Sequence, residues 1–444
     1  MLFFLTKDHM KFSRFNTTVA YTDKFVLYNA LQNQFLYINP LIKELIDASR
    51  DHDEFAGLEK LHPSLFEALH KKGFIVEDDY DEFREVVAIR EQVDLKNETF
   101  FHLTINPTMN CNFSCWYCYE SHEKKSKMES ETIEKIKVLI ENKINATSKI
   151  ERFHIAWFGG EPFLYFDRVI MPIIQFASEH CSKFGVKFDN GFTTNGFLIN
   201  RANVNALKPF DITNFQITLD GGREEHNSVR FVNDKRGSYD EIVSNIKLLC
   251  AHQRKTTLRI NYTKKNLPSV ANIAQDFLDM PIKDRDYLSI TFHKVWQEEN
   301  TEILKDTVSS LIKYFRGKGL NALIGGLPDN LRNSCYADKN NHAVINYNGE
   351  LFKCTARDFK SGNSEGFIDE NGSLIWNETY YKRLDAKFKN KPCLSCSILP
   401  ICNGGCSQVA LENMDKDYCV YNFDENSKKR VVLEKFLKLT NTYL

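Results

Sequence analysis

The sequence has little of what would mark a membrane, secreted or nucleic-acid-binding protein. Its 444 residues contain no run near the roughly 18 to 20 apolar residues that a membrane span needs. The opening Met1-Leu2-Phe3-Phe4-Leu5 is too short for a signal-peptide core and has no basic flank. The net charge is −1, so neither nucleic acid nor an anionic membrane is indicated as a partner. We therefore expect a cytoplasmic protein.

Cysteine is absent from the first 110 residues and then abundant, with 12 in the whole chain. Without a secretion signal, this number favours metal binding in a reducing compartment over disulfides. Three cysteines lie at 111–118 and seven at 335–419, whereas Cys181 and Cys250 lie in apolar helical patterns and are expected to be packing residues. With 42% hydrophobic residues the chain can bury a large core, in two or three domains.

The first cysteine group lacks a fourth member. Cys111, Cys115 and Cys118 have the spacing C-x3-C-x2-C, and three thiolates can hold three corners of a cubane iron–sulfur cluster, which ordinarily has four cysteine ligands. The remaining iron would keep an open coordination position, as catalytic metals do. A zinc knuckle or buried free thiols are the alternative, but the nearest candidates for a fourth zinc ligand, His102 and His154, lack a finger-like spacing.

This spacing, followed at once by Tyr119, resembles the signature of the radical S-adenosylmethionine (SAM) enzymes. The resemblance implies a [4Fe-4S] cluster whose open iron chelates SAM, and an electron donor such as flavodoxin or ferredoxin. Reductive cleavage of SAM would then release a 5′-deoxyadenosyl radical. It also implies a partial (β/α)6 barrel with its catalytic groups at the C-terminal ends of the strands.

Strands and helices alternate between about residues 100 and 320, as in a parallel α/β fold. The strand-like runs are at 101–105, 153–158, 186–193, 215–219, 257–262 and 288–292. Helical patterns separate them at 131–144, 168–184, 201–207, 239–252, 270–278 and 303–315. Six β/α units result, which is the number that the family resemblance implies.

The loops after the second and third strands resemble family motifs. Gly159-Gly160-Glu161-Pro162 matches the G-G-E-P motif, which in the family contacts the methionyl amine of SAM. Glycine lets the backbone approach a ligand closely. Thr194 and Asn195 end the third strand, and the resemblance adds them to the SAM-binding residues. Each motif also has an ordinary interpretation as a turn.

The fourth strand ends in Asp220, and His226 and Arg230 follow as H-x3-R. The segment is similar to the H-D-x-x-R of the peptide- and protein-modifying branch, with Asn227 where that branch often has Asp. We expect Asp220 and Arg230 to line the cavity as catalytic residues. The alternative is that Asp220 caps the following segment.

The fifth strand places polar side chains on one face, including Arg259 and Asn261. A barrel strand is normally almost entirely apolar. The family has SAM carboxylate and ribose contacts on such strands, and a guanidinium suits a carboxylate. An ion pair between Arg259 and a buried acid is the alternative. His293, on the sixth strand, is either a satisfied core histidine or a proton acceptor.

The seven C-terminal cysteines, with Gly349, resemble the SPASM extension, which holds auxiliary iron–sulfur clusters. The resemblance assigns the outer cluster to Cys393, Cys396, Cys402 and Cys419, and the inner cluster to Cys335, Cys354 and Cys406. Some family members supply a fourth cysteine to the inner cluster, and none exists here. The alternative is a pair of zinc sites.

Residues 1–95 suggest a unit of their own, with strands at 25–29 and 34–38, helices at 41–46 and 63–72, and an acidic run at 77–82 that we interpret as a solvated linker. This order is similar to the small winged-helix-like element that captures leader peptides, which can bind a peptide at a sheet edge. The alternative is a structural cap that covers the barrel.

We predict a small α+β domain at 1–95, a radical-SAM barrel at 96–325 and a SPASM domain at 326–444. The predicted function is a peptide maturase that forms a thioether or carbon–carbon cross-link in a ribosomally made precursor peptide. Within the same chemistry, the alternative is a formylglycine-forming, sulfatase-maturing enzyme. The alternative from another class of function is a non-catalytic iron–sulfur electron carrier or zinc scaffold.

Overall fold

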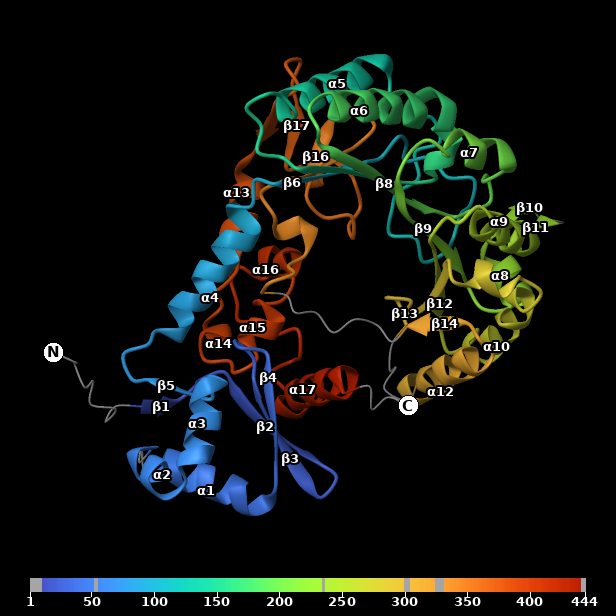
Figure 1. Ribbon diagram of the computed structural model, residues 1–444. Coiled ribbons are helices and arrows are strands. Elements are labelled where there is room, and N and C mark those ends of the chain that lie inside the picture. The colour runs from blue at the N-terminus through green and yellow to red at the C-terminus, as the bar shows by residue number, and fades with distance from the viewer. Residues whose placement is uncertain (1–9, 52–54, 234–235, 299–303, 324–330, 441–444) are drawn as a thin grey trace. The chain divides into compact units, whose positions relative to one another are not determined.

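The computed structural model describes residues 10–51, 55–233, 236–298, 304–323 and 331–440 (Figure 1). The chain forms two compact units. The first unit consists of Met1–Asn97, Leu327–Asn340 and Tyr381–Leu444, and the second of Glu98–Gly326 and Asn341–Tyr380. The predicted C-terminal region, 326–444, therefore contributes to both units.

The second unit is built on the six predicted parallel strands, which confirms the α/β fold class with its open barrel. Neighbouring strands follow the chain order β6-β7-β8-β9-β12-β13. Their bounds are β6 Phe100–Ile105, β7 Arg152–Trp157, β8 Lys187–Thr194, β9 Ile212–Leu219, β12 Thr256–Tyr262 and β13 Leu288–Lys294.

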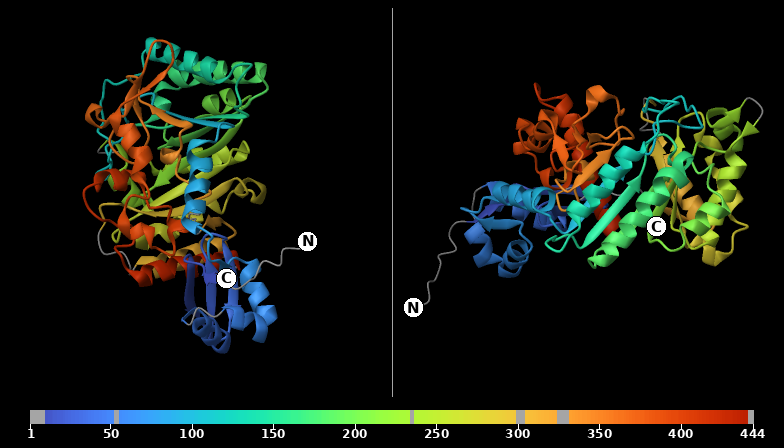
Figure 2. Two further views of the ribbon diagram at one scale, coloured as in Figure 1. Left: turned by 90° about the vertical axis from the view of Figure 1, so that its left-hand side faces the viewer. Right: turned by 90° about the horizontal axis from the view of Figure 1, so that it is seen from above.

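Helices lie along the outer side of this curved sheet (Figures 1 and 2). They are α5 Ser130–Lys143, α6 Met171–Lys183, α7 Arg201–Ala206, α8 Arg223–Val229, α9 Tyr239–Ala251, α10 Val270–Ile273, α11 Ile282–Arg285 and α12 Leu304–Gly317. The predicted helix at 270–278 is only partly α-helical, because α10 passes into a 3-10 turn, Gln275–Phe277. Cys181 and Cys250 are buried in this unit's core, which confirms that they are packing residues.

The two faces of the barrel strands differ in polarity. Alternate residues such as Leu103 of β6 and Ile155 of β7 are fully buried in the core beneath the helices. The opposite face carries polar residues, and the register of β12 on β13 pairs Arg259 with Thr291 and Asn261 with His293. A polar inner face is what a barrel needs if it is to hold a charged small molecule.

The sheet continues beyond the predicted strands at both edges, to 11 strands. β14 (Asn321–Leu323) pairs with β13, and β15 (His342–Ile345) runs parallel to β6. An antiparallel extension follows with β16 Glu350–Phe352, β17 Gly366–Ile368 and β18 Leu374–Trp376.

The first unit begins with two small antiparallel sheets and a helical group. The strands are β1 Met10–Phe12 paired with β5 Ile75–Glu77, and a meander of β2 Asn16–Tyr21, β3 Lys24–Asn29 and β4 Gln34–Ile38. The helices are α1 Pro40–Asp51, α2 Phe55–Leu61, α3 Pro63–Lys71 and α4 Glu82–Arg90, the last continuing as a π-helical turn, Glu91–Leu95.

The prediction of a solvated linker at 77–82 was wrong for its second half. The Asp81 side chain accepts hydrogen bonds from the backbone N–H groups of Phe83 and Arg84, and so caps α4. Glu82 is 3% exposed and accepts from the Ser13 hydroxyl and the Arg14 backbone N–H. An acidic run resembles a linker in sequence, but a helix start also selects acidic residues.

The C-terminal cysteine segment of the first unit folds as α13 Glu378–Ala386, α14 Lys391–Leu394, α15 Leu399–Cys402, α16 Ser407–Glu412 and α17 Glu425–Leu439. It shares one hydrophobic core with the N-terminal meander: Phe15 and Tyr28 pack in the same cluster as Ile398, Leu399 and Val432. The N-terminal strands and the outer cysteine segment are thus two halves of one packed unit.

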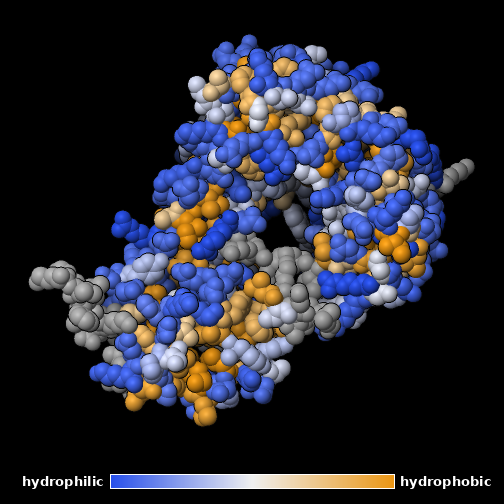
Figure 3. All heavy atoms as spheres, viewed as in Figure 1, coloured by the Kyte–Doolittle hydropathy of each residue, from blue (hydrophilic) through white to orange (hydrophobic). Residues whose placement is uncertain are grey.

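Hydrophilic residues prevail on the face of the molecule in Figure 3, with apolar residues scattered among them. Among the described residues, no helix is long and apolar enough to cross a membrane.

Candidate functional site

The three-cysteine loop leaves the C-terminal end of β6. The Thr108 hydroxyl, before the cysteines, donates to the Ser126 carbonyl, after them, at 2.7 Å, and the Phe113 ring between the first two cysteines is 2% exposed. Cys111 and Cys115 are partly buried, and Cys118 is exposed. The three candidate cluster ligands therefore lie on one short loop at the C-terminal end of the first barrel strand.

The glycine loop after β7 packs directly against this cysteine loop. Gly159 and Gly160 have φ angles of +78° and +46°, a region that favours glycine. A Cβ atom on Gly160 would lie 2.2 Å from the carbonyl oxygen of Asn110, the residue before Cys111. The backbone N–H of Glu161 donates to that same carbonyl at 2.8 Å. Glycine at 160 is thus required by the close contact between the two loops.

The Glu161 side chain is turned into the protein and holds the end of β8. Its carboxylate, fully buried, accepts from the Thr194 hydroxyl at 2.7 Å and from the Asn195 backbone N–H at 2.8 Å. Burial raises the pKa of Glu161 to about 7, against the lowering effect of these hydrogen bonds. Glu161 and Thr194 therefore contact each other, and they fix the loop that carries Asn195.

Asn195 connects the third strand to the cysteine loop. Its Nδ2 donates to Asn112 Oδ1 at 2.8 Å and lies 3.8 Å from Cys111 Sγ. The Nδ2 atom of Asn112 is buried and has no hydrogen-bond partner among the described residues. Because a buried donor without a partner is costly, this amide next to Cys111 fits a site that receives a ligand.

Asp220 and Arg230 form a buried ion pair, and Tyr117 of the cysteine loop is hydrogen-bonded to both of them. Arg230 Nε donates to Asp220 Oδ2, and both residues are at most 8% exposed. The Tyr117 hydroxyl donates to Asp220 Oδ1 at 2.5 Å and accepts from Arg230 Nη2 at 2.8 Å and Asn261 Nδ2 at 3.1 Å. One donor and two acceptor positions are all that a phenol has, so the Tyr117 hydroxyl is fully satisfied.

Protonation in this network follows from the environment. Burial raises the pKa of the Tyr117 phenol above its usual range, so that it remains a donor. Burial alone would lower the pKa of Arg230, but Tyr117 and Asp220 outweigh it and hold that pKa above the usual range. The result is a fixed guanidinium charge behind the cysteine loop. Sequence reasoning missed the role of Tyr117, although an aromatic residue directly before the third cysteine was a visible signal.

The H-x3-R segment supports this ion pair from behind. Burial, and then Arg230, lowers the pKa of His226 well below its ordinary value, so the imidazole is neutral. Its Nδ1 accepts from the Asp220 backbone N–H at 3.2 Å. Asn227, the departure from the family pattern, accepts from the backbone N–H groups of Ser238 and Tyr239 at the start of α9. The amide oxygen of Asn227 therefore serves the start of α9.

Arg259 is partly buried and has an amide neighbour. Its Nε donates to Asn261 Oδ1 at 2.9 Å, and within the described part of the chain it forms no ion pair. Burial lowers its pKa. The predicted alternative, pairing with a buried acid, is therefore not what the structure has, and the guanidinium suits an external carboxylate. His293 Nε2 lies 3.2 Å from Thr291 Oγ1, and burial followed by Arg259 lowers the pKa of His293 to about 4.

The loops after the first and sixth strands meet. Tyr119 and Trp296 stack with ring centroids 5.4 Å apart, and the Gln297 side chain donates to the Tyr117 carbonyl at 3.0 Å. Trp296 remains 56% exposed. The contact therefore joins the loops that follow β6 and β13, the first and the sixth of the predicted barrel strands.

In the first unit, one small cavity is lined by all four cysteines predicted to hold the outer cluster, Cys393, Cys396, Cys402 and Cys419. Its other walls are largely apolar, from residues such as Ile398, Leu399 and Val420. Among the residues that the structure describes, no three His, Cys, Asp or Glu side chains converge as ligands of a single metal ion. Four cysteines around one cavity are the ligand set of a cubane cluster and also of a tetrahedral zinc ion, so both interpretations of this set remain predictions.

The three cysteines predicted for the inner cluster are divided between the two units. Cys335 and Cys406 belong to the first unit and are exposed, whereas Cys354 follows β16 in the second. The ligation of an inner cluster by these residues stays a prediction.

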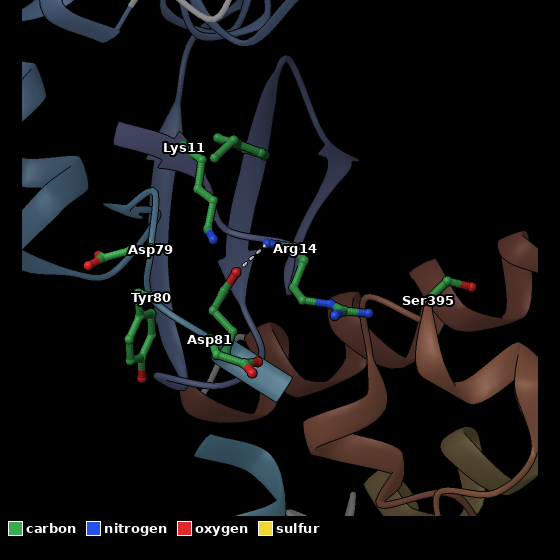
Figure 4. A pocket seen from close by; sticks show the side chains of 8 residues that line it. Lys11, Arg14, Asp79, Tyr80, Asp81 and Ser395 are labelled. Atoms are coloured by element: carbon green, nitrogen blue, oxygen red, sulfur yellow. Dashed lines mark hydrogen bonds between the residues drawn. The ribbon is translucent and has the colours of Figure 1, made fainter. Parts of the chain in front are cut away.

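A second, open cavity of about 460 Å³ lies in the first unit (Figure 4). Charged residues from the N-terminal segment line it, among them Lys11, Arg14, Asp79 and Asp81, together with Ser395 from between Cys393 and Cys396. The Arg14 guanidinium extends toward this segment and donates to the Leu394 carbonyl. The N-terminal residues thus touch the outer cysteine loop directly.

A loop of three cysteines, a glycine loop packed on it and polar strand ends behind it form the arrangement that the sequence predicted for a SAM-cleaving iron–sulfur enzyme. Residues 105–277 match the family model of the Radical SAM superfamily, so this part of the chain is a radical SAM domain. Such a domain implies a [4Fe-4S] cluster and SAM. The residues present fit that pair, because the cysteines share one loop and the buried Asn112 Nδ2 beside them has no hydrogen-bond partner in the described part of the chain.

Two curated relatives align with more of the chain than the family model does. Radical SAM cyclopropyl synthase TigE of Paramaledivibacter caminithermalis is 22% identical over 78% of this chain and 76% of its own length. A cysteine-type anaerobic sulfatase-maturating enzyme of Clostridium novyi is 25% identical over 67% of this chain and 85% of its own. An uncharacterised protein of Synechocystis is 28% identical over 48% of this chain, which spans only 52% of that relative.

The structure of native anSMEcpe with bound AdoMet and the Cp18Cys peptide has the same fold. It aligns with a TM-score of 0.59 at 19% identity, over 78% of this chain and 99% of that one. At this identity the likeness shows a shared fold, and it is the family-model match over residues 105–277 that makes the protein a radical SAM enzyme.

Proposed function

We propose that this enzyme is a peptide maturase, which removes a hydrogen atom from a ribosomally made precursor peptide and forms a thioether or carbon–carbon cross-link. In radical SAM enzymes the bound cluster and SAM supply the 5′-deoxyadenosyl radical that takes this hydrogen. The protein's share is to fix SAM and peptide in one geometry and to exclude water. The observation that carries the proposal is the contact of Gly160 with Asn110, which brings a candidate SAM-binding backbone beside the candidate cluster ligands.

The site residues would divide the work as follows. Cys111, Cys115 and Cys118 would hold the cluster. The backbone from Gly159 to Pro162 would receive the SAM amine, since glycines leave its polar groups accessible. Asn195 would complete this wall, with Glu161 and Thr194 acting through the loop that they hold.

Arg259 and Asn261 would receive the carboxylate and ribose of SAM. A guanidinium that lacks an acid partner in the described residues gains a charge-assisted hydrogen bond when a carboxylate arrives. Asp220 and Arg230 would act on the substrate side by holding the end of β9 to the cysteine loop through Tyr117. Because their charges are already paired, their role in this proposal is to position the site.

The N-terminal meander would grip the leader of the precursor. β2 and β4 are the edge strands of the three-stranded sheet, and an extended peptide can add to such an edge through its backbone. Deleting residues 1–95 is a poor test, because it removes Phe15 and Tyr28 from the core that they share with Ile398 and Val432.

Leader peptides in which proline replaces alternate residues are the better probe. Proline lacks the N–H that pairs with an edge strand, so strand addition predicts weaker binding for one of the two alternations. Fluorescence anisotropy with labelled leaders measures this. Equal affinity for the unsubstituted leader and both proline series would contradict strand addition and favour a structural cap.

The two alternative functions, a sulfatase-maturing enzyme and a non-catalytic carrier or scaffold, can be distinguished from a cross-linking maturase by their products. The similarity to a sulfatase-maturating enzyme supports the alternative that a sulfatase cysteine or serine is oxidised to formylglycine. An electron carrier or zinc scaffold would make no 5′-deoxyadenosine under strong reduction. A chain with three cubanes should contain about twelve irons, and a zinc scaffold none.

Mass spectrometry of candidate precursor peptides, co-expressed anaerobically with the enzyme, tests the main proposal. Loss of two hydrogens from one peptide would support a cross-linking maturase and identify its substrate. No change in any peptide, with intact clusters and 5′-deoxyadenosine formation, would move the assignment to a protein substrate such as a sulfatase.

A further inference from the structure

One side chain reaches the outer cysteine set without being a candidate ligand. Asn390 precedes α14 and is 9% exposed. Its Nδ2 lies 3.1 Å from Cys393 Sγ and 2.6 Å from the Tyr418 carbonyl oxygen. Since Tyr418 comes directly before Cys419, Asn390 connects the first and the last cysteine of the set.

The orientation of this amide is fixed by the backbone. Asn390 Oδ1 accepts from the Tyr418 backbone N–H at 3.2 Å, and Nδ2 donates to the carbonyl of the same residue. Exchanging oxygen and nitrogen would place two acceptors and two donors against each other, so the Tyr418 backbone selects one orientation. One amide hydrogen serves Tyr418, and the second is left for Cys393 Sγ.

A positive charge lines the same cavity. Lys428 of α17 is among its lining residues, and the Lys428 side chain is only 13% exposed. Its Nζ pairs with Glu425, whose side chain is 69% exposed. Because water screens Glu425 far more than Lys428, the pair leaves positive potential on the cysteine side.

Both features have the same effect on a cluster held by these cysteines. Uptake of one electron adds one negative charge to the cluster, and no bond is made or broken at the protein. An N–H donor to a ligand sulfur and a nearby ammonium both stabilise the more negative form. Hydrogen bonds to the sulfurs, charge and solvent exposure are the means by which proteins set cluster potentials.

We infer that Asn390 and Lys428 are positioning residues that raise the reduction potential of the outer cluster, so that it accepts an electron. The inference rests on the proposed function, in which Cys393, Cys396, Cys402 and Cys419 hold a cubane. The electron comes from the substrate radical as the new bond forms, and the accompanying proton leaves to solvent. Asn390 and Lys428 take no part as ligands.

The test is an anaerobic redox titration of the full-length holoenzyme, followed by electron paramagnetic resonance. Loss of one signal in Cys419→Ala assigns the outer cluster. In Asn390→Ala we expect the equilibrium constant for electron uptake to fall about tenfold, a shift of about 59 mV to more negative potential. Asn390→Asp should shift it further, because a carboxylate then faces the sulfur. Lys428→Met should lower the potential, and Lys428→Arg should restore it.

The matched control is Asn413→Ala, since the Asn413 amide donates to the Val409 carbonyl and, among the residues that the structure describes, forms no hydrogen bond to a cysteine sulfur. Its potential should equal that of the wild type. Unchanged potentials in Asn390→Ala and Lys428→Met, with full iron content, would overturn the inference. The inference would also be overturned if these variants held less iron while the outer clusters that did form kept the wild-type potential. That result would indicate a purely structural role for the two residues. Absence of any cubane signal that depends on Cys419 in the wild type would instead refute the proposed auxiliary cluster.

Discussion

Replacing Tyr117 by Phe removes one oxygen atom that three buried groups share. The ring remains, so packing is almost unchanged. In the wild type, the Tyr117 hydroxyl donates to Asp220 and accepts from Arg230 and Asn261. None of these three groups has an equivalent partner to replace it in the described residues. The change therefore isolates the value of the network that joins the cysteine loop to β9 and β12.

The expected cost follows from the charges of the partners. A hydrogen bond to a charged group contributes about 1.5–3 kcal/mol and a neutral one about 0.5–1.5 kcal/mol. Asp220 and Arg230 retain their own ion pair, which recovers part of the loss. We therefore expect Tyr117→Phe to lower the free energy of unfolding of the barrel unit by about 2–4 kcal/mol.

Anaerobic urea unfolding of the cluster-free protein, followed by the fluorescence of its four tryptophans, among them the fully buried Trp157, measures this cost. Tyr314→Phe is the matched control, because the Tyr314 hydroxyl bonds an exposed Gln275 side chain and should be worth less than about 0.5 kcal/mol. A Tyr117→Phe variant as stable as Tyr314→Phe would refute the reasoning, since it would mean that the three partners find other bonds.

Three further outcomes are expected. Gly160→Ala should reduce 5′-deoxyadenosine formation about 100-fold, because the new Cβ must displace the Asn110 backbone by about 1 Å. Chromatography measures the rate, and an unchanged rate would contradict the close contact between Gly160 and Asn110. Arg259→Met should weaken SAM binding about 10- to 100-fold in equilibrium dialysis, and an unchanged Kd would exclude a carboxylate contact. The pKa of His293 is lowered from 6.5 to about 4, so the unfolded chain takes up a proton there first as the pH falls. Between about pH 6.5 and 4 this should remove about 2 kcal/mol of stability, allowing for partial exposure, and His293→Asn should lose that part of the pH dependence; identical slopes would contradict it.

The sequence was sufficient where a local pattern determines structure. Buried residues alternate with more exposed ones along β7, and the six strands overlap the apolar runs that predicted them. The conformation of Gly160 follows from a motif whose residues are contiguous. Such features depend on neighbours along the chain, and those are visible in one sequence.

What the sequence did not reveal depends on partners far along the chain. Tyr117 is 103 residues from Asp220, and the sequence near either residue does not predict the hydrogen bond between them. Glu161 stands in the loop that the sequence predicts to bind SAM, yet its carboxylate accepts a hydrogen bond from the Asn195 backbone N–H. His102, weighed as a zinc ligand, instead packs edge-to-face against His154 and against His342 from the added strand β15.

The core that unites the N-terminal meander with α15 and α17 has a consequence for engineering and for evolution. A recognition element that stood alone could be exchanged between enzymes like a cassette, bringing a new leader specificity with it. Here a transplanted meander would arrive with the wrong packing surface for Ile398, Leu399 and Val432. Chimeras should therefore carry the first and last segments of the chain together, and natural relatives that change one are expected to have changed the other in step.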